Sequence, residues 1–174
     1  GYGGNTFVFL KFRTMKHNKD TSDHQQYLAD LINGCKSDEE SGSPMTKLDC
    51  INPKIFPFGR FLRNTCLDEL PQLINVLRGE MSLVGPRPPI SYEVEEYLRW
   101  HNSRFNTVPG MTGLWQVSGK NKLTFKEMTR LDIRYSQNIS IGLDLKILLK
   151  TPLAIIQEFN FSRKQYKYAG EGVE

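Results

Sequence analysis

Two adjacent carboxylates, Asp68 and Glu69, are the residues of this sequence best suited to chemistry. Thr65 precedes Asp68 by three positions, and apolar residues follow at helical spacing, so the pattern predicts a helix from Thr65 to about Gly79. Carboxylates in the first turn of a helix have two interpretations. They can cap the helix and interact favourably with its dipole. Alternatively, they can attack phosphorus or hold a divalent metal beside N–H groups that bind phosphate.

Phosphate chemistry also requires positive charge, which the sequence supplies in several segments. Lys11 and Arg13 lie at alternate positions in the run Thr6 to Met15, whose β-branched and aromatic residues predict a strand. Arg63 shortly precedes the acid pair. Arg87 lies between prolines that hold the backbone extended, which pre-organises its guanidinium for bidentate phosphate binding. Each of the other cations, taken singly, is more often a solvated surface charge.

Size and composition indicate one domain over residues 1–174, because 39% hydrophobic and 24% charged residues are ordinary for a globular chain. The net charge of +4 favours anionic partners, which include nucleic acid, anionic lipid head groups and phosphorylated small molecules. The basic residues are spread over several segments without a nucleic-acid-binding pattern, so we expect no nucleic acid partner. No pattern in the sequence indicates an oligomeric state.

Four blocks occur in order along the chain: KFRTM at residues 11–15, LDELPQLINVLRGEMSLVGPRPP at 67–89, PGMTGLWQVSGKN at 109–121, and LDIRY through LDLKILLKTP at 131–152. Together they resemble the bacterial sugar transferases, that is, the monotopic polyprenol-phosphate phosphoglycosyl transferases. The second block alone is highly specific. The resemblance implies that the chain is a single cytoplasmic catalytic domain, and that the family's N-terminal re-entrant membrane helix is absent from the sequence.

The activity that this resemblance implies is transfer of a hexose-1-phosphate from a UDP-sugar donor to undecaprenyl phosphate, a polyprenol phosphate acceptor. The reaction initiates assembly of surface polysaccharide, lipopolysaccharide or another glycoconjugate at the cytoplasmic face of the bacterial inner membrane. In the family's scheme Asp68 attacks the β-phosphate of the donor to form a covalent phosphosugar-aspartate, which the lipid phosphate then displaces. Glu69 serves as metal ligand or base, and Mg²⁺ is expected at or near the two carboxylates.

Substrate-binding residues also follow from the resemblance. Six positions match the family's motifs: Arg63, Arg87, Lys11 and Arg13 as phosphate-binding residues, and Gln116 and Lys120 as candidates for nucleotide binding. Trp115 lies in the same glycine-rich stretch and is either near the donor or a core aromatic residue. Two other functions remain open for the whole chain: a nucleotide-sugar phosphohydrolase, in which water replaces the lipid, and a catalytically silent membrane-surface interaction protein.

The fold expected around these residues is α+β, mostly helical around a small β-sheet, with amphipathic membrane-interface helices. Residues 16–50 are expected to form a polar excursion. Proline, glycine and capping residues define the other elements. They are a helix at Ser22 to Asn33, packed irregular chain at Asn52 to Asn64, a stiff loop at Met81 to Pro89, a helix at Ser91 to Phe105, a short strand within Gly110 to Lys120, a helix from the Thr124 and Glu127 capping box to about Asn138, and a helix from Leu143 to about Gln157.

The stretch Ile141 to Ile156 is the most apolar part of the sequence, but charged residues and Pro152 interrupt it. It is too short for a membrane span, which requires roughly 18–20 continuous apolar residues. Its residues Leu145, Leu148, Leu149 and Ile156 lie at helical spacing and are more often core residues. The alternative is an interfacial helix whose two lysines, Lys146 and Lys150, rest on anionic lipid head groups.

Overall fold

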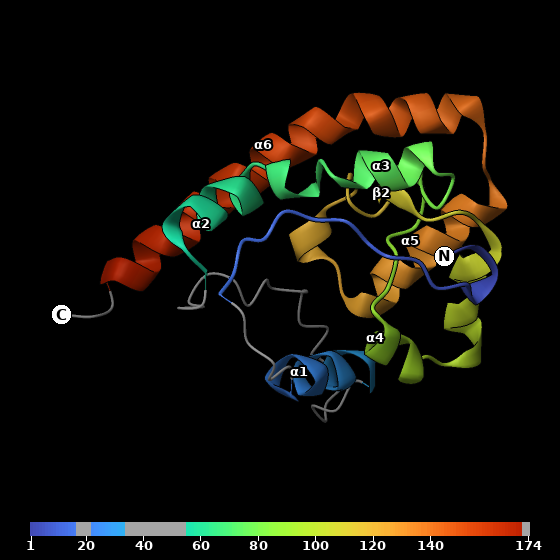
Figure 1. The fold of residues 1–174 in the computed structure, drawn as a ribbon, viewed down its shortest axis with the longest axis horizontal. Helices are drawn as coiled ribbons and strands as arrows, with labels where there is room; N and C mark the ends of the chain where they lie inside the picture. The colour runs from blue at the N-terminus through green and yellow to red at the C-terminus, as the bar shows by residue number, and fades with distance from the viewer. Residues whose placement is uncertain (17–21, 34–54, 172–174) are drawn as a thin grey trace.

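Helices pack around a two-stranded parallel sheet in the computed structural model, which describes residues 1–16, 22–33 and 55–171 (Figure 1). Strand β1 (Ser82–Val84) pairs with β2 (Gly110–Thr112), so that Ser82 lies opposite Gly110 and Val84 opposite Thr112. The predicted α+β class, mostly helical around a small sheet, is therefore confirmed.

The α-helices are distributed along the whole described chain. Their bounds are α1 (Ser22–Asn33), α2 (Pro57–Asn64), α3 (Gln72–Leu77), α4 (Ser91–Glu95), α5 (Phe125–Gln137) and α6 (Ile141–Glu171). The described residues also form short 3₁₀ segments: η1 (Tyr2–Gly4) before the first helix, and η3 (Leu67–Glu69), η4 (Arg99–Asn106) and η5 (Lys120–Lys122) between later helices. In the view of Figure 1, α2, α3 and α6 lie along one side of the molecule and α1 lies on the opposite side. Among the described helices, none is long and apolar enough to cross a membrane.

Two apolar clusters form the core. In the first, Val84 of β1 packs with Tyr135 of α5 and Ile147 of α6, and the Tyr135 hydroxyl donates to the Val84 carbonyl at 3.2 Å. In the second, Trp115 packs with Phe125 and other residues of α5, and only 3% of Trp115 is exposed. Trp115 is thus a core aromatic residue, the second of the two interpretations that the sequence allowed.

Glycines allow the strand ends to approach each other unusually closely. A Cβ atom on Gly110 would lie 2.0 Å from the backbone nitrogen of Gly85, and one on Gly113 would lie 2.4 Å from the Gly85 carbonyl oxygen. Any larger residue at these positions would separate the two backbones. The loop that carries Arg87 is therefore fixed against the segment that leads from β2 to Lys120.

Three predicted elements are confirmed where the sequence carried a strong local signal. The helix Ser22–Asn33 has the expected bounds, and β2 is the strand expected within Gly110 to Lys120. The capping box at the start of α5 forms as predicted, because the Thr124 hydroxyl accepts from the Glu127 N–H at 3.2 Å and the Glu127 carboxylate accepts from the Thr124 N–H at 2.9 Å. Most of the polar excursion at residues 16–50 lies outside the described residues.

The prediction of a strand at Thr6 to Met15 was wrong. Residues 5–14 run extended without a strand partner among the described residues, and only Met15 forms an isolated antiparallel bridge, to Ile55. The Asn75 side chain and the Asp68 carbonyl bind the backbone of this segment instead. β-Branched and aromatic residues favour an extended backbone, but a neighbouring chain is needed to make a sheet.

The irregular chain predicted at Asn52 to Asn64 is also incorrect over its described part, because Pro57–Asn64 is helix α2. Pro57 occupies the start of the helix, where its missing N–H costs nothing and its fixed φ favours helical geometry. Gly59 allows α2 to touch the extended segment, since a Cβ there would lie 2.2 Å from the Thr14 carbonyl oxygen. Residues 52–54 lie outside the described part of the chain.

The single helix predicted from Thr65 to Gly79 is divided into η3 and α3, so that prediction was wrong in its details. Cys66 adopts the left-handed conformation with φ 56°, which interrupts the helix before the acid pair. The Thr65 hydroxyl donates to the Phe61 carbonyl at 2.8 Å, and thus closes α2 rather than capping a new helix. Pro71 then separates η3 from α3, because it has no N–H to donate.

Three further boundaries differ from the predictions. The expected loop at Met81 to Pro89 contains strand β1, and the expected helix at Ser91 to Phe105 is divided into α4 and η4. The last helix, α6, continues beyond Gln157 to Glu171 despite Pro152. Tertiary contacts determine these boundaries, because no short-range sequence signal indicates the parallel pairing of β1 or the break after α4.

The core interpretation of the apolar stripe on α6 was wrong for all four of its residues. Leu145 and Leu149 are 55% and 77% exposed, and Leu148 and Ile156 are exposed as well. Ile147 is the residue of this helix that enters the core, with 1% exposure. The stripe therefore forms an apolar surface.

Replacement of Gly110 by alanine tests the close contact between β2 and the loop after β1. Gly110→Ala should lower the free energy of unfolding by about 2–3 kcal/mol, because its Cβ would meet backbone atoms that cannot move aside easily. Gly142→Ala is the matched control, since a Cβ there meets nothing within 4 Å in helix α6. It should be neutral or stabilising by up to about 1 kcal/mol. Urea denaturation measures both, and equal unfolding midpoints would contradict the prediction.

Candidate active site

The acid pair lies in η3, at the turn between α2 and α3. Asp68 is 2% exposed, whereas the side chain of Glu69 is 35% exposed. Lys11 contacts both carboxylates, since its Nζ lies 2.9 Å from Asp68 Oδ2 and 3.2 Å from Glu69 Oε1. The structure therefore brings one predicted cation directly onto the two predicted catalytic residues.

Lys11 reaches the pair because the extended N-terminal segment is fixed to the acid-bearing turn and to α3. The Phe12 N–H donates to the Asp68 carbonyl at 2.9 Å. Asn75, which is fully buried, accepts from the Leu10 N–H at 3.1 Å and donates to the Val8 carbonyl at 2.8 Å. The side chain of one buried asparagine thus replaces the strand partner that this segment lacks.

Two more predicted cations act on Glu69 through their charge. Burial alone would raise the pKa of Glu69, but Lys11, Arg87 and Lys120 together hold it below its usual value. Arg87 follows β1 and Lys120 begins η5, so the cations come from three separate segments. Cations that converge on a carboxylate from separate segments suit the binding of a phosphate group beside it.

Among the described residues, no hydrogen bond or ion pair joins the acid pair to the remaining predicted residues, Arg63, Arg13 and Gln116. The Arg63 guanidinium donates to the Thr14 hydroxyl at 3.3 Å, so it contacts the extended segment close to Lys11 in the chain. Arg13 is exposed, and no ion pair joins it to Asp68 or Glu69 within the described residues. Gln116 donates to the Met111 carbonyl at 3.4 Å and packs against Gly113, within its own loop.

A buried charged network that no sequence pattern predicted holds the Arg87 loop. Arg104 of η4 is 2% exposed and binds Asp132 of α5 at 2.5 Å. Its Nη1 also donates to the Tyr97 hydroxyl, which in turn donates to Glu93 at 2.6 Å. The same guanidinium donates to the Arg87 carbonyl at 3.1 Å, and thereby fixes the backbone of the proline-rich loop.

The energetics of this network depend on the buried Arg104–Asp132 pair. Burial raises the pKa of Asp132, and the Arg104 guanidinium opposes that rise. Removing Asp132 would leave the buried Arg104 guanidinium with only the more distant Glu93, at 3.6 Å, as its anion among the described residues. No short-range pattern signals this pair, because its members are 28 residues apart in different elements.

The acid pair fits a magnesium ion by the chemistry of its donors. Mg²⁺ usually binds proteins through one or two carboxylates, and substrate phosphates and water complete its coordination. Asp68 Oδ2 is buried and accepts no hydrogen bond from the described residues, although the Lys11 ammonium lies beside it. Within the described residues there is no cluster of three or more acidic, histidine or cysteine ligands. Asp68 and Glu69 are thus the residues that would hold such an ion together with a phosphate substrate.

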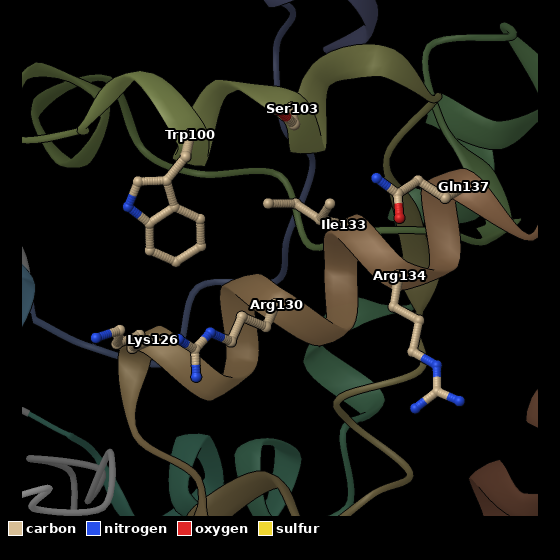
Figure 2. Close-up of a pocket in the computed structure, with 7 residues that line it drawn as sticks. All are labelled: Trp100, Ser103, Lys126, Arg130, Ile133, Arg134 and Gln137. Carbon is tan, nitrogen blue, oxygen red and sulfur yellow. The ribbon is translucent and has the colours of Figure 1, made fainter.

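A groove of about 450 Å³ lies elsewhere, between η4 and α5 (Figure 2). Trp100 and Ser103 form one wall, and Lys126, Arg130, Ile133, Arg134 and Gln137 project from α5. None of the predicted site residues lines it. The groove and the acid pair are therefore separate features of the molecule.

A helix-rich α+β fold that presents two carboxylates to converging cations is suited to phosphoryl transfer. The chain belongs to the bacterial sugar transferase family, since the model of that family, "Bacterial sugar transferase", matches residues 1–158. This confirms the resemblance that the four sequence blocks indicated.

Individual relatives match most of the chain. It is 43% identical over 152 residues to "Galactosyl transferase CpsE" of Streptococcus agalactiae serotype III (strain NEM316), covering 87% of this chain and 32% of that protein. It is 40% identical over 155 residues to "Exopolysaccharide production protein ExoY" of Sinorhizobium fredii (strain NBRC 101917 / NGR234), covering 89% of this chain and 66% of that protein. It is 40% identical over 157 residues to "Undecaprenyl-phosphate galactose phosphotransferase" of Salmonella typhimurium, covering 90% and 32%. The chain thus spans between about a third and two thirds of the length of these relatives.

Replacement of Asp132 tests the network that fixes the Arg87 loop. Asp132→Asn should lower the free energy of unfolding by about 3 kcal/mol, because it leaves the buried Arg104 guanidinium without its closest anion. Glu95→Gln removes an exposed acid from α4 and should change stability by less than about 0.5 kcal/mol. Chemical denaturation measures both variants. A loss no larger for Asp132→Asn than for the control would contradict the assignment.

Proposed function

We propose that the protein is a sugar-phosphate transferase that moves a hexose-1-phosphate from a UDP-sugar to undecaprenyl phosphate through a covalent phosphosugar-aspartate. The observation that carries the proposal is the buried Asp68 carboxylate, 2.9 Å from Lys11, beside Glu69, on which Arg87 and Lys120 act through their charge. The names of two relatives support the substrates: "Undecaprenyl-phosphate galactose phosphotransferase" and "UDP-glucose:undecaprenyl-phosphate glucose-1-phosphate transferase".

In the first proposed step an Asp68 carboxylate oxygen attacks the β-phosphorus of the donor. The bond between this phosphorus and the bridging oxygen breaks, and UMP leaves with that oxygen and its electron pair. Lys11, Arg87 and Lys120 lower the barrier because they stabilise the charge that gathers on the phosphate oxygens in the transition state. The contact between Lys11 and Asp68 is exchanged for a contact between Lys11 and the incoming phosphate.

In the second proposed step a phosphate oxygen of the lipid carrier attacks the same phosphorus. The bond from phosphorus to the Asp68 oxygen breaks, so the carboxylate is regenerated and the sugar is linked to the lipid by a diphosphate. Dividing the transfer into two displacements means that only one anionic nucleophile approaches the phosphorus at a time. Glu69 is proposed to act as the base that accepts the proton of a protonated lipid phosphate, a role open to it because the neighbouring cations keep it ionised.

A Mg²⁺ ion, held by Asp68 and Glu69, would supply further neutralisation of phosphate charge. The proposal does not depend on the ion for the nucleophile, which is the carboxylate itself. Arg63 and Arg13 are proposed to bind phosphate from α2 and from the extended segment, and Gln116 to bind the nucleotide.

The proposed lipid acceptor requires a membrane surface, and an apolar face of the described structure fits that partner. Helix α2 packs on α6, and α3 and α6 both contact β1. Exposed apolar side chains occur on all three helices: Phe58 and Phe61 on α2, Leu73, Ile74 and Leu77 on α3, and Ile141, Leu145, Leu149, Leu153 and Ile156 on α6. Soluble monomers rarely expose so many large apolar residues on neighbouring elements. We propose that this face lies on the cytoplasmic leaflet, with Lys146 and Lys150 near anionic head groups.

Asparagine at position 68 tests the nucleophile. Asp68→Asn should reduce UMP release from a UDP-sugar by at least about 10³-fold, because an amide oxygen cannot form the covalent intermediate. Asp30→Asn, which changes an exposed aspartate on α1, is the matched control and should keep the wild-type rate. The assay uses the natural full-length chain in membranes that contain undecaprenyl phosphate.

Two outcomes would oppose the proposal. Wild-type rates from Asp68→Asn would exclude Asp68 as nucleophile. UMP release at the same rate without polyprenol phosphate would instead indicate a hydrolase, in which water is the acceptor. A phosphosugar adduct trapped on the peptide that contains Asp68 is the expected positive result.

Charged substitutions on α6 test the membrane face. Leu145→Glu and Leu149→Glu should each weaken binding to vesicles of anionic lipid by about tenfold, because each removes a leucine that would be buried in the interface. Leu98→Glu is the control, since Leu98 is 56% exposed but lies outside the three helices. Vesicle co-sedimentation measures binding. An equal loss for all three variants would contradict the assignment of the face.

A further inference from the structure

Glu158 is a buried acidic residue that the reaction scheme does not use. It lies on α6, and only 2% of its side chain is exposed. Its Oε2 atom forms an ion pair with Lys120 Nζ, and Cys66 Sγ lies 4.0 Å from the same oxygen. One carboxylate oxygen of α6 thus contacts both the loop that follows β2 and the turn that precedes the acid pair.

Lys120 is joined to Glu158 by an ion pair, and the same Glu158 oxygen lies 4.0 Å from Cys66, two residues before Asp68. The charge of Lys120 lowers the pKa of Glu69, yet within the described residues no ion pair joins it to Glu69. Its ion pair is with Glu158. A lysine side chain is long and flexible, so without a fixed partner it would move toward the nearest anion.

A buried carboxylate is a strong restraint on such a lysine. The side chains of Lys120 and Glu158 are 23% and 2% exposed, so water screens their attraction only weakly and the pair resists separation. A lysine ammonium has three donor hydrogens, so it can bind Glu158 with one and a phosphate oxygen with another. Holding the ammonium in advance also reduces the entropy lost when substrate binds.

We infer that Glu158 is a positioning residue that holds the Lys120 ammonium toward the donor phosphates and prevents it from pairing with Glu69. The inference rests on the proposed function for its substrate. Glu158 itself does not touch the reacting atoms. Glu158 acts through Lys120. Because Glu158 belongs to α6, it connects Lys120 to this helix, and the side of α6 opposite Glu158 carries the exposed apolar residues.

Glu158→Gln tests the inference in the full chain, with a UDP-sugar as donor. The KM for the donor should rise by about tenfold, the loss expected for one charge-assisted contact, whereas kcat should change by less than about threefold. In a Lys120→Met background the same substitution should change KM by less than about twofold, because the residue through which it acts is absent. Glu95→Gln serves as the charge-matched control. Equal effects of Glu158→Gln in both backgrounds would overturn the inference and leave a purely structural role.

A second measurement does not depend on turnover. In the wild-type protein, a short pulse of an amine-acylating reagent should modify Lys120 several-fold more slowly than the exposed Lys146 and Lys150, as read by mass spectrometry of peptides. In Glu158→Gln the rate at Lys120 should rise several-fold while the other two stay constant. Equal rates for the three lysines in the wild type would overturn the inference even if the variant failed to fold.

The two measurements separate the inference from the function on which it rests. If the wild-type protein released no UMP but Lys120 was protected by Glu158, the proposed function would fail and the positioning would stand. If UMP release depended on Asp68 but Lys120 was equally reactive with and without Glu158, the function would stand and the inference would fail.

Discussion

Two neighbouring carboxylates, one of them almost fully withdrawn from water, are the electrostatic constraint on which the described structure depends. A buried carboxylate is stable only beside a compensating charge. Lys11 meets this requirement at Asp68 by direct contact, and Arg87 and Lys120 act through their charge on the neighbouring Glu69. Because these cations are far apart in the sequence, the folds of three separate segments must converge on one short turn.

Backbone contacts and buried polar side chains bring these three segments together, more than strands or helices do. Over the described residues the sheet consists of two short strands, so it cannot position the segments alone. Glycine at 85, 110 and 113 brings the Arg87 loop against the segment leading to Lys120. Asn75 holds the N-terminal segment, and the Arg104–Asp132 pair holds the Arg87 backbone. The segments that carry Lys11, Arg87 and Lys120 are therefore each held in place by a different set of contacts.

The sequence correctly predicted those elements whose structure is determined by interactions between residues close together in the chain. The helix at residues 22–33 and the Thr124 capping box depend on periodicity and on hydrogen bonds between near neighbours, so both were predicted correctly. The Thr65 pattern had the same form and failed, because Cys66 turns into the left-handed region and the Thr65 hydroxyl binds the preceding helix. The extended run at residues 6–15 failed for a different reason, since a strand is defined by its partner. The family resemblance named Lys11 and Arg87 as phosphate-binding residues and Lys120 as a nucleotide-binding candidate, but not their positions relative to the acid pair. No sequence pattern indicated Arg104, Asp132 or Glu158, because their partners are distant in the sequence.

Helix α6 connects the surface of the molecule to its site. One side of it exposes leucines and isoleucines, and the other places Ile147 in the core and Glu158 against Lys120. The Thr151 hydroxyl also bonds to Thr112 of β2 at 2.9 Å, so the helix is tied to the sheet as well. On the proposed function, the acceptor phosphate arrives from the membrane and the donor from water, and both must meet Asp68. A helix that rests on the lipid surface with one side and holds an active-site lysine with the other fixes the orientation of the acid pair relative to the membrane. On this proposal the same helix would set both the docking of the protein on the membrane and the position of Lys120 in its site.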